Sequence, residues 1–578
     1  MNPTSAPIQE SAEENPENPS ARPAWSVGAR YLFGRLCFGG LVVALGFFCL
    51  SLTPSLLPRS PLFQGLVSGA STAIGYGLGS AISAGIRQIS RQEPSQRSKR
   101  IAWRLLLGGS VLFLGIFAWY GAQWQEDVRS LMGMGQLRSY HWLLIAAIAA
   151  TIALVLLGVA RIVRGLTRLA IKGLARFIPK RIAVGVGVVL AALILYLAVT
   201  DVLFGGVVSV VNSAYAKVNG GTSHRVTQST SELRTGGPES FVSWASLGTE
   251  GHDFTGDGGS PTVAEIETFT KEPALAPVRV YIGIESADTL KARTRLAVRE
   301  LERTGGFDRA VLVIYAATGT GWIDPIAANA IDYMYGGNTA GVGMQYSFLP
   351  SWISFLVDSN KAADTSRALT HAVVSRVAQL PPGDRPDVLV FGESLGSFGA
   401  ESAFPNIEDL LARTDGTLLV GPTFQNPIHD RLRAQRDEPS PFWRPLMDGG
   451  KHVRSAIAPS ELTDPSLYPK GSAWTMPRVA YLQNSSDPVG YFEPSLLWKS
   501  PEWLEEPRGP DVSDSIRWIP FVTFAQVGAD LAAGGTVPVG HGHVYRGRIV
   551  DGWAQLLDPA GWTSKKTEDL KTLLTDGK

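Results

Sequence analysis

The stretch DVLVFGESLGSFGAESAF, residues 387–404, decides the fold of this 578-residue chain. DVLVF has the composition of a buried strand, FGAESAF is compatible with a helix, and the turn between them reads G-x-S-x-G. A serine in such a strand–turn–helix sits on a tight, strained turn with its hydroxyl exposed. The stretch therefore predicts Ser394 as a nucleophile, and the N–H of Leu395 as a donor that can face an oxyanion at the start of a helix.

The other residues of the turn fit the same prediction. Gly392 and Gly396 stand two before and two after Ser394, where small residues relieve crowding, and Glu393 completes the turn. The alternative interpretation is a glycine-rich turn that binds nothing or binds phosphate.

The sequence around this stretch alternates short apolar runs with amphipathic stretches of helical length, such as 288–305 and 366–380. The predicted strands are 278–284, 310–316, 343–348, 387–391, 417–421, 478–484 and 516–522. Near-continuous apolar strands separated by helices are typical of an α/β fold with a mostly parallel sheet covered on both faces. We expect this domain over 276–578, preceded by a Gly/Ser/Thr-rich linker and N-terminal extension over 206–275.

The partners of the serine are expected after later strands. Asp487 follows the predicted strand 478–484 and is the candidate acid, with an Asx-turn before Pro488 as the alternative. The base is His543 or His541, both in VPVGHGHVY (537–545), and the pattern favours His543 without excluding the other. Chelation of a metal by the two histidines lacks a third ligand nearby, so no metal and no cofactor is predicted. The order serine, acid, histidine is that of an α/β-hydrolase triad.

A second oxyanion donor is expected from the loop after strand 310–316. Its candidates are the N–H groups of Thr318 and Gly319, and Trp322 is a candidate wall of an acyl pocket. An ordinary glycine turn, with Asp324 capping the next helix, is the alternative. Residues 422–475 are long for a connection, which predicts either a lid over the site or a packing excursion.

The N-terminal part has a different composition. Five apolar segments lie at about 33–53, 62–86, 101–121, 141–160 and 182–205, and a helix needs ~20 apolar residues to cross a bilayer. They predict an α-helical transmembrane domain of about five spans over 30–205, after a Pro- and Glu-rich disordered tail at 1–29. The small residues of the second segment suit close helix packing in lipid.

Charge separates the two parts. The net charge of +1 combines 19 Lys/Arg and 8 Asp/Glu in residues 1–205 with 33 and 43 in residues 206–578. Basic residues gather in the loops after the second and fourth segments, so the positive-inside rule places these loops and the tail in the cytoplasm and the catalytic domain outside it. Because the basic residues flank apolar runs, a nucleic-acid partner is not expected.

The whole chain resembles a bacterial family of membrane-anchored α/β-hydrolases, with an N-terminal multi-pass domain and a C-terminal catalytic domain. The stretches that carry the resemblance are SLTPSLLPR (51–59), TGTGWIDP (318–325), FGESLGSFGAES (391–402), NSSDPVGYF (484–492) and GHGHVY (540–545). The resemblance implies a serine hydrolase in the cytoplasmic membrane with Ser394 as nucleophile, and it does not choose between His541 and His543.

The expected function is therefore a membrane-anchored serine hydrolase of the esterase or lipase type, acting on carboxylic esters or thioesters of lipids or envelope components. Its expected partners are the lipid bilayer and an ester or lipid substrate, and the sequence predicts no particular oligomeric state. An acyltransferase with the same triad is one alternative. A non-catalytic membrane scaffold with a hydrolase fold is the other, although the spans lack the buried charges of transport pathways.

Overall fold

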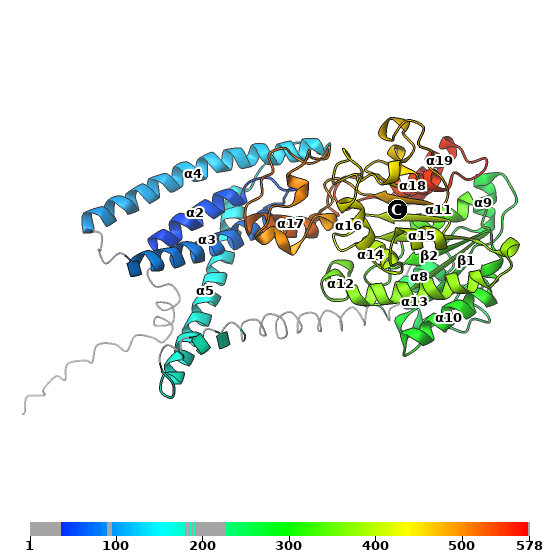
Figure 1. The fold of residues 1–578 in the computed structure, drawn as a ribbon, viewed down its shortest axis with the longest axis horizontal. Helices are drawn as coiled ribbons and strands as arrows, with labels where there is room; N and C mark the ends of the chain where they lie inside the picture. Colours follow the sequence, from blue (N-terminus) through cyan, green and yellow to red (C-terminus); the bar gives the residue numbers. More distant parts are fainter. Residues whose placement is uncertain are drawn as a thin grey trace, which may run out of the picture.

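The computed structural model describes residues 36–89, 95–137, 139–179 and 226–575, with isolated residues between 182 and 219. Figure 1 shows long helices at one end of the molecule and an α/β domain at the other. The long helices are α2 (Phe38–Ser51), α3 (Pro61–Ile89), α4 (Gln96–Leu131) and α5 (Trp142–Leu174). The expected tail at 1–29 and most of the fifth apolar segment lie outside the described residues.

Seven strands form one parallel sheet in the order β1-β3-β2-β4-β5-β7-β6. The strands are β1 (Val278–Ile282), β2 (Val311–Ala316), β3 (Thr339–Met344), β4 (Asp387–Glu393), β5 (Gly416–Val420), β6 (Val453–Ala456) and β7 (Arg478–Leu482). In the register, Ala316 at the end of β2 pairs with Gly392 of β4, and Glu393 pairs with Val420 of β5. The carboxyl ends of these strands therefore meet at one edge, where ligands bind in open α/β sheets.

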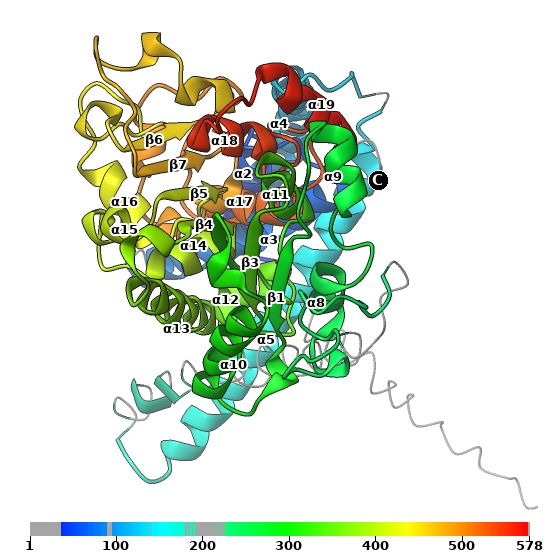
Figure 2. The same cartoon turned by 90° about the vertical axis from the view of Figure 1, so that its right-hand side faces the viewer.

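Helices cover both faces of the sheet, as Figure 2 shows. One layer holds α10 (Leu290–Arg303), α13 (Ser359–Ala378) and α14 (Leu395–Ser402), and the other holds α11 (Pro325–Met334) and α18 (Arg548–Leu557). The remaining helices are α8 (Gly248–Thr255), α9 (Val263–Thr270), α12 (Ser351–Val357), α15 (Ile407–Arg413), α16 (Pro427–Ala434), α17 (Val522–Ala533) and α19 (Ser564–Thr575).

The core lies between the sheet and these layers. Every residue of β2 is buried, as expected for a parallel strand covered on both faces. In α18 the residues Ile549, Val550, Trp553 and Leu556 recur at helical spacing and are fully buried against the sheet. Burial of each such side chain contributes about 1.5–3 kcal/mol to the stability of the domain.

The sheet corrects two predictions. Residues 516–521 form no strand; the apolar side chain of Ile516 instead enters a buried cluster beneath α17, and Trp518 Nε1 donates to Leu496 O at 2.9 Å. Strand β6 was not predicted, because its residues VRSA include Arg454 and Ser455 and do not form an apolar run. Strand β3 begins four residues earlier than the predicted 343–348.

Strand β6 lies within the expected insertion 422–475, so part of that stretch extends the sheet at its edge. The buried Arg454 is accommodated because Nε donates to Gly450 O at 2.8 Å and Nη1 to Leu462 O at 2.6 Å. Its guanidinium also lies over the Tyr468 ring at 3.7 Å. The prediction of one lid over 422–475 is therefore too simple for this segment.

The long helices pack closely through small residues. A Cβ on Gly79 of α3 would lie 2.3 Å from Gly39 O of α2, and one on Gly69 would lie 2.8 Å from Ala149 O of α5. The expected close packing of the second apolar segment is thus present.

Among the described residues, two helices, α4 and α5, are long and apolar enough to cross a membrane, instead of about five. Helix α2 has only 14 residues, which is short for a span. Helix α3 is long enough, but many of its residues are Gly, Ala and Ser, which are less apolar than Leu, Ile, Phe and Val.

The helical part contacts the α/β domain through the loop 52–60 and helix α17 (Figure 1). Ser55 Oγ and the N–H of Leu56 each donate to the buried Asp530 carboxylate at 3.0 Å. Gln526 Nε2 donates to Thr53 O at 2.8 Å. The SLTPSLLPR stretch is therefore part of the contact between the two parts, together with the end of α4.

Candidate active site

Ser394 stands on the turn between β4 and α14 with φ 54° and ψ −124°, a backbone conformation that costs a non-glycine residue free energy. Its N–H donates to Val420 O at 2.9 Å. A Cβ on Gly392 would lie 2.5 Å from Gly396 O, and a Cβ on Gly396 would lie 2.3 Å from Ala316 O. Both glycines are therefore required by close backbone approach, and the serine is held on the strained turn that the sequence predicted.

Asp487 lies in the loop after β7, which ends at Leu482, and is fully buried. Its Oδ2 accepts from His543 Nδ1 at 2.8 Å and from Tyr545 Oη at 2.7 Å, and its Oδ1 accepts from the N–H of Val489 at 3.0 Å. A carboxylate with three donors is fixed in position, so it can orient the imidazole and stabilise its protonated form.

His543 lies close to the nucleophile turn. A Cβ on Gly421 would lie 2.6 Å from His543 Cε1, and Gly421 follows Val420, whose carbonyl accepts from Ser394. Burial by itself would lower the pKa of His543, but the adjacent Asp487 carboxylate raises that pKa above its usual value. The structure thus brings Ser394, His543 and Asp487 to neighbouring strand ends.

His541 belongs to a second pair that the sequence did not predict. Its Nδ1 lies 2.8 Å from Asp511 Oδ2, and Asp511 also accepts from the hydroxyls of Ser485 and Ser486. The Ser486 hydroxyl in turn accepts from the N–H of Gly542 at 2.9 Å, which links the two histidine pairs. Asp511 lies in a loop with no strand before it, so no positional signal marked it.

The expected oxyanion donors from the β2 loop are engaged elsewhere. The N–H of Thr318 donates to Trp322 O at 2.9 Å, and that of Gly319 donates to Tyr346 Oη at 2.7 Å. Neither amide is free to bind an oxyanion in this structure, because the loop closes on itself in a tight turn.

Two other amides have no acceptor within the part of the chain that the structure describes: those of Leu395 and Ala317. Leu395 begins α14, and Ala317 is buried directly after β2, beside the close approach of Gly396. This is the strand-end position from which the second donor comes in such sites. In this structure the N–H groups of Leu395 and Ala317 are thus available to a ligand, and those of Thr318 and Gly319 are not.

The surface beside the nucleophile turn is apolar. Leu395 forms a buried cluster with Tyr346 and Phe355, and Phe398 and Phe424 pack against it. Trp322 is only half-buried, on the loop after β2. Aromatic side chains of α12, α14 and the loops after β3 and β5 therefore pack around Leu395, and Trp322 is not part of this cluster.

Two further carboxyl groups lie at the site. Burial and the nearby Asp324 raise the pKa of Glu393 to about 8, so this side chain holds a proton at neutral pH. Asp324 Oδ1 accepts from the N–H of Ile326 at 2.6 Å and so caps α11, as the alternative interpretation of that residue expected.

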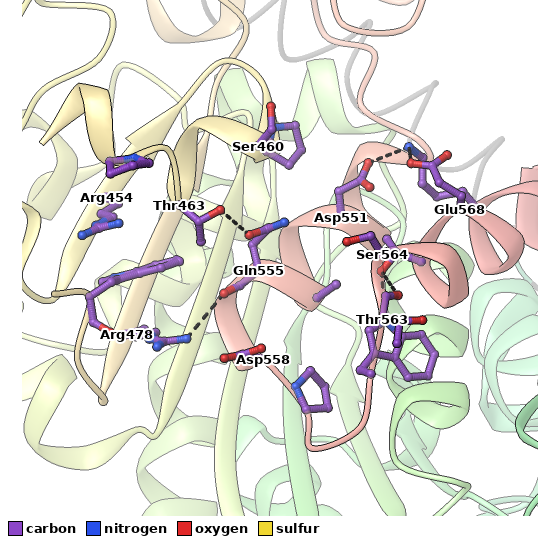
Figure 3. A pocket seen from close by; sticks show the side chains of 18 of the residues that line it. Arg454, Ser460, Thr463, Arg478, Asp551, Gln555, Asp558, Thr563, Ser564 and Glu568 are labelled. Atoms are coloured by element: carbon purple, nitrogen blue, oxygen red, sulfur yellow. Dashed lines mark hydrogen bonds and ion pairs between the residues drawn. The ribbon is translucent and has the colours of Figure 1, made fainter.

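A separate cavity of about 820 Å³ lies between the β6–β7 connection and helices α18 and α19, as Figure 3 shows. Gln555 accepts from Thr463 Oγ1 at 2.6 Å across it. None of Ser394, Asp487 and His543 lines this cavity, so its size does not make it the active site. Across the described ranges, no group of three His, Cys, Asp or Glu side chains is arranged to hold a metal ion.

Residues 278–570 match the model of an alpha/beta-hydrolase family, and residues 52–259 match the model of the N-terminus of the same alpha/beta-hydrolase family. The chain therefore belongs to this α/β-hydrolase family, and the family supports a hydrolase function. The comparisons with curated proteins and with solved structures gave no match.

Proposed function

We propose that this protein is a membrane-anchored serine hydrolase that cleaves carboxylic ester or thioester bonds. The observation that carries the proposal is the buried Asp487–His543 pair beside a strained serine turn at the carboxyl edge of a parallel sheet. Each element of the pair is fixed before substrate arrives, which is what nucleophilic catalysis by a serine requires.

In the proposed mechanism, Ser394 Oγ attacks the ester carbonyl while His543 Nε2 takes its proton. The imidazolium that forms is stabilised by Asp487, whose carboxylate is held in place by hydrogen bonds from Tyr545 Oη and the N–H of Val489. The proton then passes to the leaving alcohol, which departs and leaves an acyl-enzyme. Water attacks this intermediate with His543 again acting as base, and Ser394 is regenerated.

The negative charge of each tetrahedral intermediate would be held by the amides of Leu395 and Ala317. Both lie where β2 and β4 end side by side, and Leu395 adds the positive end of α14. The apolar cluster around Leu395 suits an acyl group, which supports a lipid or another apolar ester as substrate.

The membrane anchor is proposed from α4 and α5. Their most apolar windows have almost no buried residues, which distinguishes them from core helices of a soluble protein. Exposed apolar side chains such as Leu107, Val111 and Leu143 would be covered by lipid.

The orientation of the anchor is proposed from charge and contact together. The hydrolase domain contacts the loop 52–60 and the end of α4, whereas basic residues such as Arg97, Arg100 and Arg168 lie toward the opposite ends of α4 and α5. The positive-inside rule then favours a catalytic domain outside the cytoplasmic membrane of a bacterial cell. A fusion after Lys578 to a reporter that works only outside the cytoplasm should be active, and activity of a cytoplasm-only reporter at the same site would contradict the orientation.

Labelling with a fluorophosphonate probe tests the proposed chemistry. The full chain in detergent should be labelled, and Ser394→Ala should abolish labelling because the probe reacts only with an activated serine. Ser402→Ala, at the other end of α14, is a matched control and should keep labelling, because its hydroxyl donates only to Phe398 O at 2.7 Å. Persistent labelling of Ser394→Ala would refute the assignment of the nucleophile.

A further inference from the structure

A cavity of about 350 Å³ lies where the loops between the long helices meet the hydrolase domain. We call it the junction cavity. Its walls come from the facing ends of α2–α5 and, on the hydrolase side, from Thr536. Arg59, Arg129 and His141 line it, and within the described part of the chain no Asp or Glu does. A cavity with positive lining and no carboxylate is suited to an anion.

Of the two arginines, Arg59 is buried, with 7% of its surface exposed. Its Nη1 donates to Ser51 O at 3.1 Å and its Nη2 to Thr53 O, but its Nε has no acceptor among the residues that the structure describes. The Asp530 carboxylate that acts on its charge is itself engaged by Ser55 and Leu56. A buried guanidinium with a spare donor favours an added anion.

Gln125 supplies a second spare donor to the same cavity. Its side chain is 6% exposed, and its Oε1 accepts from the N–H of Arg59 at 2.8 Å. That bond directs its amide nitrogen away from Arg59, and the nitrogen has no acceptor in the described residues. Both residues line the cavity, and their two spare donor atoms lie just beneath its wall with less than 1 Å² of accessible surface each. Buried polar groups almost always find partners, and a small rotation of either side chain would present its donor to an oxyanion.

An apolar groove continues from the junction cavity along the helices. It has a volume of about 470 Å³ and is lined by α2, α3, α4 and α5 without any charged residue. Leu52 of the cavity lies one helical turn from Phe48 of the groove, and Ile145 of the cavity precedes Ala146 of the groove on α5. The basic cavity and the apolar groove are therefore consecutive along the same helices.

We infer that the junction cavity and the groove together bind one anionic phospholipid. Arg59, Gln125 and Arg129 would hold the phosphate of its head group, and an acyl chain would lie along the groove. Tyr140 and Trp142 stack at 5.4 Å where α5 begins, and aromatic residues mark the head-group level of membrane proteins. This inference rests on the proposed membrane embedding, and it is independent of the proposed ester hydrolysis.

Native mass spectrometry of the full chain in detergent tests the inference, in a Ser394→Ala background so that no lipid is turned over. The probes are dioleoylphosphatidylglycerol, dioleoylglycerol, which has the same chains without phosphate, and glycerol 3-phosphate. We expect phosphatidylglycerol to bind at least about tenfold more tightly than either of the others. Arg59→Gln should weaken it about tenfold, the loss expected for one charge-assisted contact.

Arg104→Gln is the matched control, because Arg104 is on α4 at the end remote from the cavity, and it should leave binding unchanged. If Arg59→Gln does not give a monodisperse protein, Arg129→Gln decides, with an expected loss of about threefold or more. Equal binding of phosphatidylglycerol by the cavity variant and its parent would overturn the inference. So would equal binding of dioleoylglycerol, or of glycerol 3-phosphate.

Discussion

Two histidine–aspartate pairs lie two residues apart in this protein, and they have the same internal geometry. His543 and His541 each place Nδ1 at 2.8 Å from Oδ2 of their own aspartate. Their surroundings differ. His543 packs against Gly421 beside the serine turn, and its partner Asp487 is held by Tyr545 and a backbone amide.

The second pair is hydrogen-bonded to residues of the surrounding loops instead. Asp511 accepts from two serine hydroxyls, and Ser486 connects it to the backbone of Gly542, between the two histidines. A short histidine–carboxylate distance therefore does not by itself define a catalytic pair. What defines it is a place at the carboxyl ends of the central strands, next to the nucleophile. On this account the outer pair positions the loop that carries the inner one.

The largest expected difference between the pairs is in their carboxylates. Asp487→Asn removes the charge that stabilises the imidazolium and should lower kcat/KM for a p-nitrophenyl ester by about 10³-fold or more. Asp511→Asn makes the same change in the outer pair and should cost less than about tenfold, because only loop position is affected. Equal losses of kcat/KM in the two variants would contradict the assignment of only the inner pair to catalysis.

Substitution of Tyr545, which donates to Asp487, should lower kcat/KM less than Asp487→Asn does. Its hydroxyl donates to Asp487 and accepts from the N–H of Asn484, so Tyr545→Phe leaves two buried groups short of a partner. We expect the free energy of unfolding, measured in denaturant, to fall by about 1–3 kcal/mol. We expect kcat/KM to fall by about threefold to tenfold. A variant as stable as the parent would contradict the role of this hydrogen bond.

The pH profile of kcat/KM tests how Asp487 acts on the pKa of His543 in the inner pair. The mechanism needs neutral His543, and Asp487 raises its pKa above the usual value of about 6.5. As pH falls through this raised pKa the histidine becomes protonated and activity is lost, so the acid limb of kcat/KM should have its midpoint above 6.5. A midpoint below 6 would show that the electrostatic account of the inner pair is wrong.

The smallest expected effect concerns Glu393, whose carboxyl group also raises the pKa of His543. Glu393→Gln should move the acid limb to lower pH. The movement should be slight, because Glu393, with a pKa of about 8, is already mostly protonated near the midpoint. A movement to higher pH would contradict the assigned sign.

The sequence could predict Ser394, Asp487 and a histidine of 537–545 as partners, but it could not predict Asp511, for physical reasons. Ser394 and Asp487 follow apolar strands, and strand ends in a parallel sheet converge, so their proximity was predictable. Asp511 lies in a loop, and its approach to His541 depends on tertiary packing that no periodicity records. The choice between the histidines therefore required the structure.

The backbone donors were equally hard to predict. The Thr-Gly-Thr-Gly loop signalled a ligand site, but the N–H of Thr318 closes a turn on Trp322 O and that of Gly319 donates to Tyr346 Oη, which leaves Ala317 as the available donor. Apolar content predicted long helices correctly. It did not separate α3, which packs through its glycines, from α4 and α5, which expose apolar side chains. Such distinctions depend on which face a residue presents after folding.

The two histidines can be distinguished by measuring kcat/KM of His543→Gln and His541→Gln side by side on the same ester. We expect kcat/KM to fall by about 10³-fold or more in His543→Gln and by less than about tenfold in His541→Gln. Circular dichroism of both variants should show the parent's fold. A larger loss in His541→Gln than in His543→Gln would contradict the assignment of Ser394, His543 and Asp487 as the catalytic triad.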